Sequence, residues 1–216
     1  MKLVSVNVSP PKEIGEPGRE VRTGIFKEPV AGRIAVGRTN LEGDGQADLT
    51  VHGGVHKAVY AYPIEHYDTW RRELGRDDLP WGQFGENLTV EGMLEEGVCI
   101  GDVFRVGSAS LEVSQPREPC FKLGIKFRSP AFPKKFLKSE RSGFYFRVIE
   151  EGEVGACDSI LRIHSDPARL SVREVFHLKM FDRQNTEGVR RALAVEALSP
   201  SWREAFTRIL EKSGGA

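Results

Sequence analysis

The chain has 216 residues, of which 39% are hydrophobic, and its 31 basic residues balance its 31 acidic ones. A neutral overall charge argues against a general nucleic-acid-binding protein, and no apolar run reaches the roughly 18 residues of a membrane span, so an anion site must be local. With no leader-like start and three scattered cysteines, we expect a cytoplasmic protein with reduced thiols and neither a nucleic-acid nor a membrane partner.

Residues 1–163 consist of short strand-like runs separated by turn residues, a pattern typical of a β-rich sandwich or a closed barrel. Helices are expected to interrupt this region at residues 63–74, with Pro63 near the first turn, and at residues 131–139. The expected strands are KLVSVNVS, EVRTGIF, RIAVG, AVYAY, ENLTV, VFRVG, LEVSQ, FYFRVI and SILRI.

The periodicity becomes helical in the last quarter of the chain. Ser171 and Glu174 form a capping box, and apolar residues follow it at helical spacing. A second helix is predicted in EGVRRALAVEAL, and a third begins at Pro200 with Trp202 and Phe206 on its apolar stripe. A tail this short must pack on the strand region or on a second protomer.

The stretch from Gly37 to Tyr62 combines flexible glycines with side chains that can donate to a phosphate. It is either an anion-binding cradle or a solvated hairpin loop. A zinc helix through His52 and His56 is excluded by the glycine pair between them, and no P-loop or nucleophile elbow is present. The candidate donors are Arg38, His52, His56 and Lys57, and the glycines are Gly43, Gly45, Gly53 and Gly54.

The segment LEVSQPREPCFKLG, residues 111–124, begins as a strand that Pro116 and Pro119 must end, because proline has no N–H to donate. Arg117 and Cys120 then lie in a stiffened exit loop, where catalytic groups commonly occur. Cys120 is either such a group or a small buried hydrophobe. Asn87, in WGQFGENLTVEG, either offers an amide at the start of a strand or belongs to an ordinary turn.

Taken in order, these segments resemble the MOSC family, named from the C-terminal domain of molybdenum cofactor sulfurase, and in particular its YiiM-like bacterial branch. The resemblance rests on RTNLEGDGQADLTVHGGVHKAVYAYPIEHYDTW, FGENLTVEG, CIGDVFRVG, LEVSQPREPCFKL and SGFYFRVIEEGEV. It implies a mainly β protein with a MOSC-type β-barrel domain and a few short helices over residues 1–163. A small all-α three-helix domain over residues 164–216 completes the implied organisation.

The resemblance also implies a molybdenum cofactor at the mouth of the barrel, with Cys120 as the catalytic residue and metal ligand. The glycine-rich stretch, with Gly53 and Gly54, would hold the pterin and its phosphate. Related sequences commonly have an acidic residue where this chain has His56, which makes its contribution an open question. The implied cofactor-binding residues are Arg38, His52, Gly53, Gly54, His56, Lys57, Asn87 and Arg117.

As for activity, the resemblance implies a molybdenum-dependent oxidoreductase that reduces N-hydroxylated compounds of the hydroxylaminopurine or amidoxime type by removing an oxygen atom. Three cysteines cannot form a Cys₄ cluster site and no flavin motif is visible, so an external flavin or iron–sulfur reductase must supply electrons. We also expect a homodimer. The alternative is a sulfur-carrier or cofactor-handling module without turnover.

Overall fold

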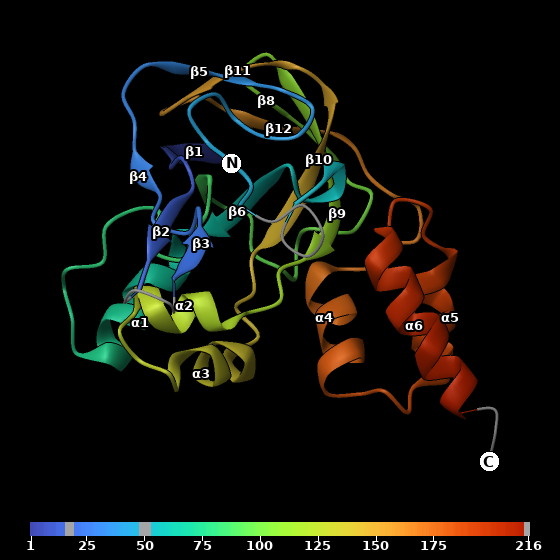
Figure 1. Ribbon diagram of the computed structural model, residues 1–216. Coiled ribbons are helices and arrows are strands. Elements are labelled where there is room, and N and C mark those ends of the chain that lie inside the picture. The colour runs from blue at the N-terminus through green and yellow to red at the C-terminus, as the bar shows by residue number, and fades with distance from the viewer. Residues whose placement is uncertain (16–19, 48–52, 214–216) are drawn as a thin grey trace.

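The computed structural model describes residues 1–15, 20–47 and 53–213, and it consists of a sheet-rich region followed by three helices (Figure 1). The strands are β1 (Lys2–Val8), β2 (Lys12–Ile14), β3 (Val21–Thr23), β4 (Glu28–Pro29), β5 (Arg33–Val36), β6 (Val59–Pro63), β7 (Leu88–Glu91), β8 (Val103–Val106), β9 (Ala109–Pro116), β10 (Phe144–Glu150), β11 (Gly152–Gly155) and β12 (Ile160–His164). The helices are η1 (Val55–Lys57), α1 (Glu65–Leu74), α2 (Phe121–Lys126), α3 (Phe132–Ser139), α4 (Val172–Met180), α5 (Thr186–Ala194) and α6 (Pro200–Ser213).

Eight strands form one mixed sheet in the order β12-β8-β9-β10-β6-β7-β1-β4. Strands β6 and β7 run parallel, and the other neighbouring pairs of this sheet are antiparallel. Two further two-stranded ladders, β11-β5 and β2-β3, complete the sheet structure of the described residues.

The prediction of a closed barrel requires correction, because the described strands form an open sheet with β12 and β4 at its edges. The outer edge of β1 is divided: its C-terminal end pairs with β4, and its other end meets the start of β12 through an isolated bridge, from Lys2 to Ser159, and a few backbone hydrogen bonds, such as that from Ile160 N to Met1 O at 3.0 Å. Cys157, at φ 75°, lies in the turn that precedes this bridge. A continuous ladder from β1 to β12 therefore does not form, and the region is a mixed, sheet-rich fold with several helices.

Most of the expected elements are present, with local differences. The helices predicted at 63–74 and 131–139 are α1 and α3, although Pro63 is the last residue of β6 instead of a first-turn residue. Strand β9 ends at Pro116, as the missing N–H of proline predicted. The sequence pattern did not indicate α2 or the short strands β2, β4 and β11.

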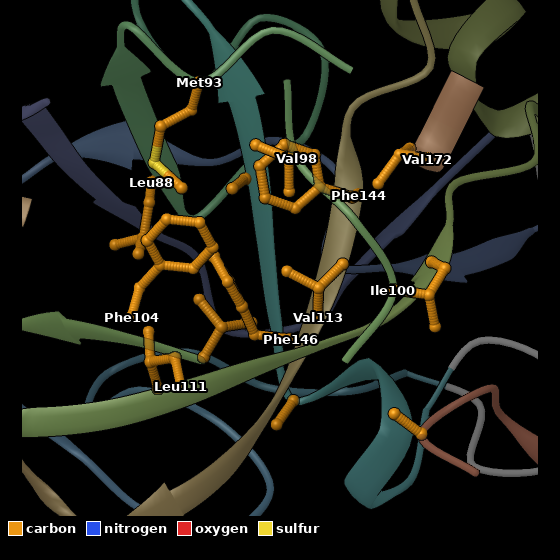
Figure 2. Close-up of a cluster of buried hydrophobic side chains, with 14 of the residues drawn as sticks. Leu88, Met93, Val98, Ile100, Phe104, Leu111, Val113, Phe144, Phe146 and Val172 are labelled. Carbon is orange, nitrogen blue, oxygen red and sulfur yellow. The ribbon is translucent and has the colours of Figure 1, made fainter. Parts of the chain in front are cut away.

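The larger of two buried clusters, here called the sheet–tail core, runs from the sheet into the C-terminal helices. Figure 2 shows part of it, with Phe104 of β8 and Phe146 of β10 among side chains from β7, β9, the 93–100 loop and the start of α4. Val189, Trp202 and Phe206 of the tail belong to the same cluster. The tail thus shares its apolar core with the sheet instead of forming an independent one.

Backbone hydrogen bonds also connect the tail to the sheet region. Val172 N donates to Val98 O at 2.8 Å, and Ser199 N donates to Ser114 O at 3.1 Å. The predicted capping box is present: Ser171 and Glu174 exchange side-chain-to-backbone bonds at the start of α4. In the part of the chain that the structure describes, no helix combines the length and the apolar character needed to cross a bilayer.

The second buried cluster, here called the aromatic cluster, lies where α1, α2 and α3 pack against β6. Tyr62 and Phe84 stack with centroids 4.3 Å apart, and Trp70 lies parallel to Phe136 at 5.9 Å. The members are Ile25, Tyr60, Tyr62, Tyr67, Trp70, Leu79, Phe84, Leu123, Phe127, Phe132 and Phe136. This cluster supports the wall of the pocket described next.

Candidate functional site

A pocket opens at one end of the sheet, beside the aromatic cluster. It is lined by β3 and the segment after it, the loop around Asp44, η1 and the start of β6, the turn before β7, and the segment that joins β9 to α2. Its lining carries one acidic side chain, Asp44, and four basic ones, which are Lys27, Lys57, Arg117 and Lys122. The lining is thus locally basic in a chain of zero net charge, which favours an anionic ligand.

Cys120 lines this pocket at the point where the chain enters α2. It is the extended residue immediately before the helix, with φ −127° and ψ 171°, and its thiol is half-buried. Pro116 still pairs with Phe144 of β10, so the connection from the sheet to the thiol is only three residues long. The other two cysteines are not in the pocket: Cys99 is buried and Cys157 is exposed.

Arg117 lines the same pocket and is 5% exposed. Its guanidinium lies over the rings of Tyr60, at 5.2 Å, and Phe136, at 5.3 Å. Its Nη1 is buried without a hydrogen-bond partner, and no carboxylate of the described residues forms an ion pair with it. Because a buried charge without a counter-ion is costly, this geometry favours an anionic ligand in the pocket.

Tyr60 and Tyr145 line the pocket beside Arg117. Burial raises the pKa of both tyrosines, so their phenols stay neutral in the physiological range and do not act as counter-ions to Arg117. The Tyr60 and Tyr145 rings pack against each other with centroids 5.1 Å apart.

Asp44 organises the opposite wall of the pocket. It forms an ion pair with Lys27, accepts from Asn87 Nδ2 at 2.8 Å through Oδ2, and accepts from Ser9 N at 3.0 Å. Burial lowers the pKa of Lys27, and the charge of Asp44 partly offsets that effect. Asn87 also accepts from Tyr60 N at 3.1 Å, so its amide is engaged by the protein and ties β6 to this wall.

Four of the residues predicted to hold a cofactor or metal meet in this pocket: Lys57, Asn87, Arg117 and Cys120. Their roles toward a ligand stay predictions. Of the remaining candidates, His52 lies outside the described residues. Arg38, Gly53, Gly54 and His56 do not contribute to the lining.

Two of these outlying residues have structural partners instead. Arg38 is exposed, and its backbone N–H donates to Glu151 Oε1 at 2.9 Å. Gly54, at φ 89°, precedes η1, and its N–H donates to Gln46 Oε1 at 2.7 Å. A positive φ of this size suits glycine, so Gly54 shapes the loop that delivers Lys57 to the pocket.

His56 faces the sheet. Its Nδ1 lies 3.5 Å from Arg147 Nη1, and its carbonyl accepts from Ser114 Oγ at 2.6 Å. Burial lowers its pKa, as does the charge of Arg147, so the neutral imidazole is favoured. His56 therefore packs beside Arg147, and its position outside the pocket lining does not favour a direct contact with the ligand.

Sequence reasoning missed Lys27, Asp44 and Lys122 as pocket residues. Asp44 was within the glycine-rich stretch but was not singled out, and Lys122 directly follows the Cys120–Phe121 pair. Lys27 carried no local signal, because its position in the pocket comes from the ion pair with Asp44, 17 residues away.

Two further charged residues, Lys126 and Glu86, connect segments that adjoin the pocket. Lys126 Nζ donates to Ile25 O at 2.8 Å and also to Gly82 O, which joins α2 to two pocket-side segments. Burial lowers the pKa of Lys126 to about 8, against the opposing charge of Glu86. Glu86 is buried and accepts from Gly82 N at 2.8 Å and Phe84 N at 3.0 Å; burial raises its pKa.

The donor set fits the anionic part of a molybdenum cofactor. The unpartnered Arg117 Nη1 and the neighbouring lysines suit a phosphate, and the Cys120 thiol offers a soft ligand. The pocket encloses about 100 Å³, below the roughly 300–1,000 Å³ of typical small-molecule sites, so it would hold only part of a pterin cofactor. No group of three or more His, Cys, Asp or Glu side chains that could hold a metal occurs in the described ranges, so a metal at Cys120 would take its other ligands from the cofactor.

Two family models match the chain. The MOSC domain matches residues 48–161, and the YiiM-like, 3-alpha helix domain matches residues 170–213. The MOSC domain is associated with binding of the molybdenum cofactor.

Similar proteins cover nearly the whole chain. The Bacillus subtilis protein YflK is 43% identical over 95% of this chain and 93% of its own length, and Escherichia coli YiiM is 35% identical over 88% and 84%. A Gibberella moniliformis protein named "Reductase" is 37% identical over 74% of this chain, which corresponds to 29% of the fungal protein.

Among solved structures, YiiM from Geobacillus stearothermophilus superposes with a TM-score of 0.83 and 38% identity, covering 97% of this chain and 98% of that one. YiiM from Escherichia coli superposes with a TM-score of 0.76 and 28% identity, covering 98% and 94%. The two domain matches and the full-length similarity to YiiM agree with the pocket around Cys120, and the chain therefore belongs to the MOSC family, in its YiiM-like branch.

Proposed function

We propose that this protein is a molybdenum-cofactor-dependent oxidoreductase that reduces N-hydroxylated compounds, of the hydroxylaminopurine or amidoxime type, to amines or amidines. The observation that carries the proposal is the juxtaposition, in one basic pocket, of Cys120 with the buried guanidinium of Arg117, whose Nη1 has no hydrogen-bond partner. Family membership and the reductase name of the fungal relative add support.

In this proposal the chain's own residues divide the work. Arg117, with Lys57, binds the phosphate of the cofactor and prevents it from leaving. Cys120 would supply a soft sulfur ligand to the metal. Asp44 holds Lys27 and Asn87 in position and keeps the opposite wall rigid. When bound, the cofactor supplies two-electron oxygen-atom-transfer chemistry.

The overall reaction takes two electrons and two protons for each substrate molecule. The N–O bond breaks, the nitrogen keeps its electron pair and becomes an amine or amidine, and the oxygen leaves as water. The protons come from solvent, and the electrons come from a separate flavin or iron–sulfur protein, because three cysteines do not suffice for a Cys₄ cluster in this chain. We also propose a homodimer, in keeping with the expectation from the sequence.

The deciding experiment uses protein expressed in a host that makes the molybdenum cofactor. We expect about one molybdenum per chain by elemental analysis and dithionite-driven conversion of 6-hydroxylaminopurine to adenine. Molybdenum-loaded protein that fails to turn over this substrate and an amidoxime, but carries a persulfide on Cys120 by intact mass, would instead support a sulfur carrier. Protein without molybdenum or persulfide would contradict both functions.

A further inference from the structure

The segment from Phe121 to Ser139, which contains α2 and α3, has an unusual charge composition. It carries six basic residues and no acidic residue, although the whole chain has zero net charge. The six are Lys122, Lys126, Arg128, Lys134, Lys135 and Lys138. Helices α2 and α3 pack side by side (Figure 1), and α2 contributes Lys122 to the pocket lining, so these charges are concentrated on one part of the molecule.

Three of the six charges are directed to solvent. Arg128, Lys134 and Lys138 are exposed, and within the described ranges no carboxylate forms an ion pair with them. The others are used by the fold: Lys126 donates to backbone carbonyls, and Lys135 pairs with Glu73 at 3.3 Å. An exposed cluster of like charges without counter-charges is destabilising in isolation and suits an oppositely charged partner.

Two apolar side chains stand in the same region. Phe121 is 60% exposed and Ile125 is 38% exposed, and they are one helical turn apart on α2. The opposite face of this helix is buried: Lys122 lines the pocket and Leu123 belongs to the aromatic cluster. Helix α2 is therefore a wall with the pocket on one side and an exposed apolar pair on the other.

We propose that Phe121, Ile125, Arg128, Lys134 and Lys138, here called the α2–α3 surface, form the docking site for an acidic electron-transfer protein that reduces the centre at Cys120. This inference rests on the proposed function, which requires an external donor. Exposed apolar side chains and exposed basic groups on two neighbouring helices have the composition of a transient protein interface, which combines apolar contacts with complementary charge.

The position of the surface favours an electron donor over other acidic partners. Phe121 directly follows Cys120 in the chain, and consecutive Cα atoms across a trans peptide are about 3.8 Å apart. A donor seated on Phe121 would therefore place its redox group near the thiol that contacts the metal. Two successive one-electron donations, each oxidising one donor molecule, would supply the two electrons that cleave one N–O bond.

The first test measures binding, which does not depend on the reaction. The full-length protein is titrated by calorimetry with an acidic plant-type [2Fe–2S] ferredoxin at low and at high ionic strength. We expect saturable binding that weakens with salt, and a loss of at least about tenfold in affinity for the triple variant Arg128→Glu, Lys134→Glu, Lys138→Glu. A control variant with the same change in charge, Arg190→Glu, Arg191→Glu, Lys212→Glu, changes only the tail and should bind as the wild type does.

A second variant tests the apolar centre of the surface. Phe121→Ala removes the exposed ring without changing the charge, and we expect it to lower ferredoxin affinity about tenfold, as loss of a central interface aromatic commonly does. Its thermal unfolding should match that of the wild type, since a ring that is mostly exposed contributes little to the core.

Turnover with two electron sources separates this inference from the proposed function. The Arg128/Lys134/Lys138 variant should lose ferredoxin-driven reduction of 6-hydroxylaminopurine but keep dithionite-driven reduction. If loaded wild-type protein shows no dithionite-driven turnover, the proposed function fails, and the binding data still test the surface.

Several results would overturn the docking site. The docking site would be wrong if the wild type did not bind the ferredoxin. It would also be wrong if the α2–α3 triple variant and the control triple variant bound it with equal affinity. A basic-residue variant that loses affinity for single-stranded DNA or anionic vesicles as strongly as for the ferredoxin would reveal a general polyanion surface. A dimer–monomer shift on sedimentation, caused by Phe121→Ala alone, would assign the surface to self-association.

Discussion

The two buried clusters of this protein differ in chemistry as well as in size. The sheet–tail core is built mainly of aliphatic and phenylalanine side chains, with Trp202 among them, and it connects strands to the C-terminal helices. Cations lie over two of its rings, Arg162 over Phe104 at 5.2 Å and Lys179 over Trp202 at 4.2 Å, but neither cation lines the pocket. The aromatic cluster has charged groups set against it: Arg117 lies over Tyr60, and Arg141 lies 4.7 Å from the centre of the Trp70 ring. Cations can remain buried beside aromatic faces because the ring quadrupole attracts them.

The two clusters therefore differ in what a change to their side chains should affect. Removing a side chain other than Ala58 from the sheet–tail core should change stability alone, because none of the other members of this cluster lines the pocket. The aromatic cluster supports the groups that line the pocket, since Phe136 packs between Trp70 and Arg117. A change there should alter both stability and ligand binding.

The largest effects are expected from the two fully buried tryptophans, one in each cluster. Trp202→Ala and Trp70→Ala should each lower the free energy of unfolding by about 3–5 kcal/mol, measured by urea denaturation. Molybdenum retention per folded molecule should fall only for Trp70→Ala. Equal retention in both variants would show that the aromatic cluster does not support the pocket.

Cys120→Ser isolates the chemistry from the packing. The half-buried thiol becomes a hard hydroxyl of nearly the same size, so turnover per bound molybdenum should fall by more than the roughly 10–100-fold that outer partners of a metal commonly cost. Cys99→Ser, in the buried core, should cost stability but leave turnover per folded molecule unchanged. Wild-type turnover in Cys120→Ser would remove its role as a metal ligand.

Lys57→Ala tests which basic residues reach the ligand. Loss of one charge-assisted hydrogen bond, worth about 1.5–3 kcal/mol, should weaken cofactor retention by about ten- to a hundredfold. Arg38→Ala is the matched control: because Arg38 does not line the pocket, this variant should retain the cofactor better than Lys57→Ala does. Cofactor retention is measured by dilution followed by metal analysis. If Arg38→Ala retained less cofactor than Lys57→Ala, this assignment would be wrong.

The last effect is a pH dependence of stability caused by Lys126. Its pKa falls from 10.5 to about 8 on folding, so between these values the unfolded chain binds more protons than the folded one. The contribution of this group to the free energy of unfolding therefore increases as pH rises through that window, by at most about 1.4 kcal/mol per pH unit. This gain in stability has not begun well below pH 8, where the lysine is charged in both states, and it is complete above pH 10.5, where the lysine is neutral in both.

Urea titrations of wild type and Lys126→Met across this pH range measure the effect. The wild type should gain stability relative to the variant as pH rises, whereas exposed Lys138→Met should parallel the wild type. Parallel curves for all three proteins would mean that Lys126 is not desolvated. Burial also lowers the pKa of Lys27, so only differences between variants are informative.

Much of the fold could be predicted from local sequence patterns. The alternation of Leu111 and Val113 predicted strand β9, the prolines predicted its end, and Ser171 with Glu174 predicted the start of α4. Each of these signals depends on residues at most a few positions apart, for which backbone geometry and capping chemistry are sufficient. The ordered motifs also carried the family resemblance, which the domain matches confirmed.

The tertiary structure alone decided how the sheet ends and which residues share the pocket. β1 meets β4 at one end and the start of β12, after the turn at Cys157, at the other, and no local pattern encodes either contact. The contact of Asp44 with Asn87 joins residues 43 positions apart, and Lys126 bonds to Ile25 across 101. Such contacts form only when the packed elements bring distant segments together, so the sequence indicated the thiol at Cys120, and the fold supplied the charges around it.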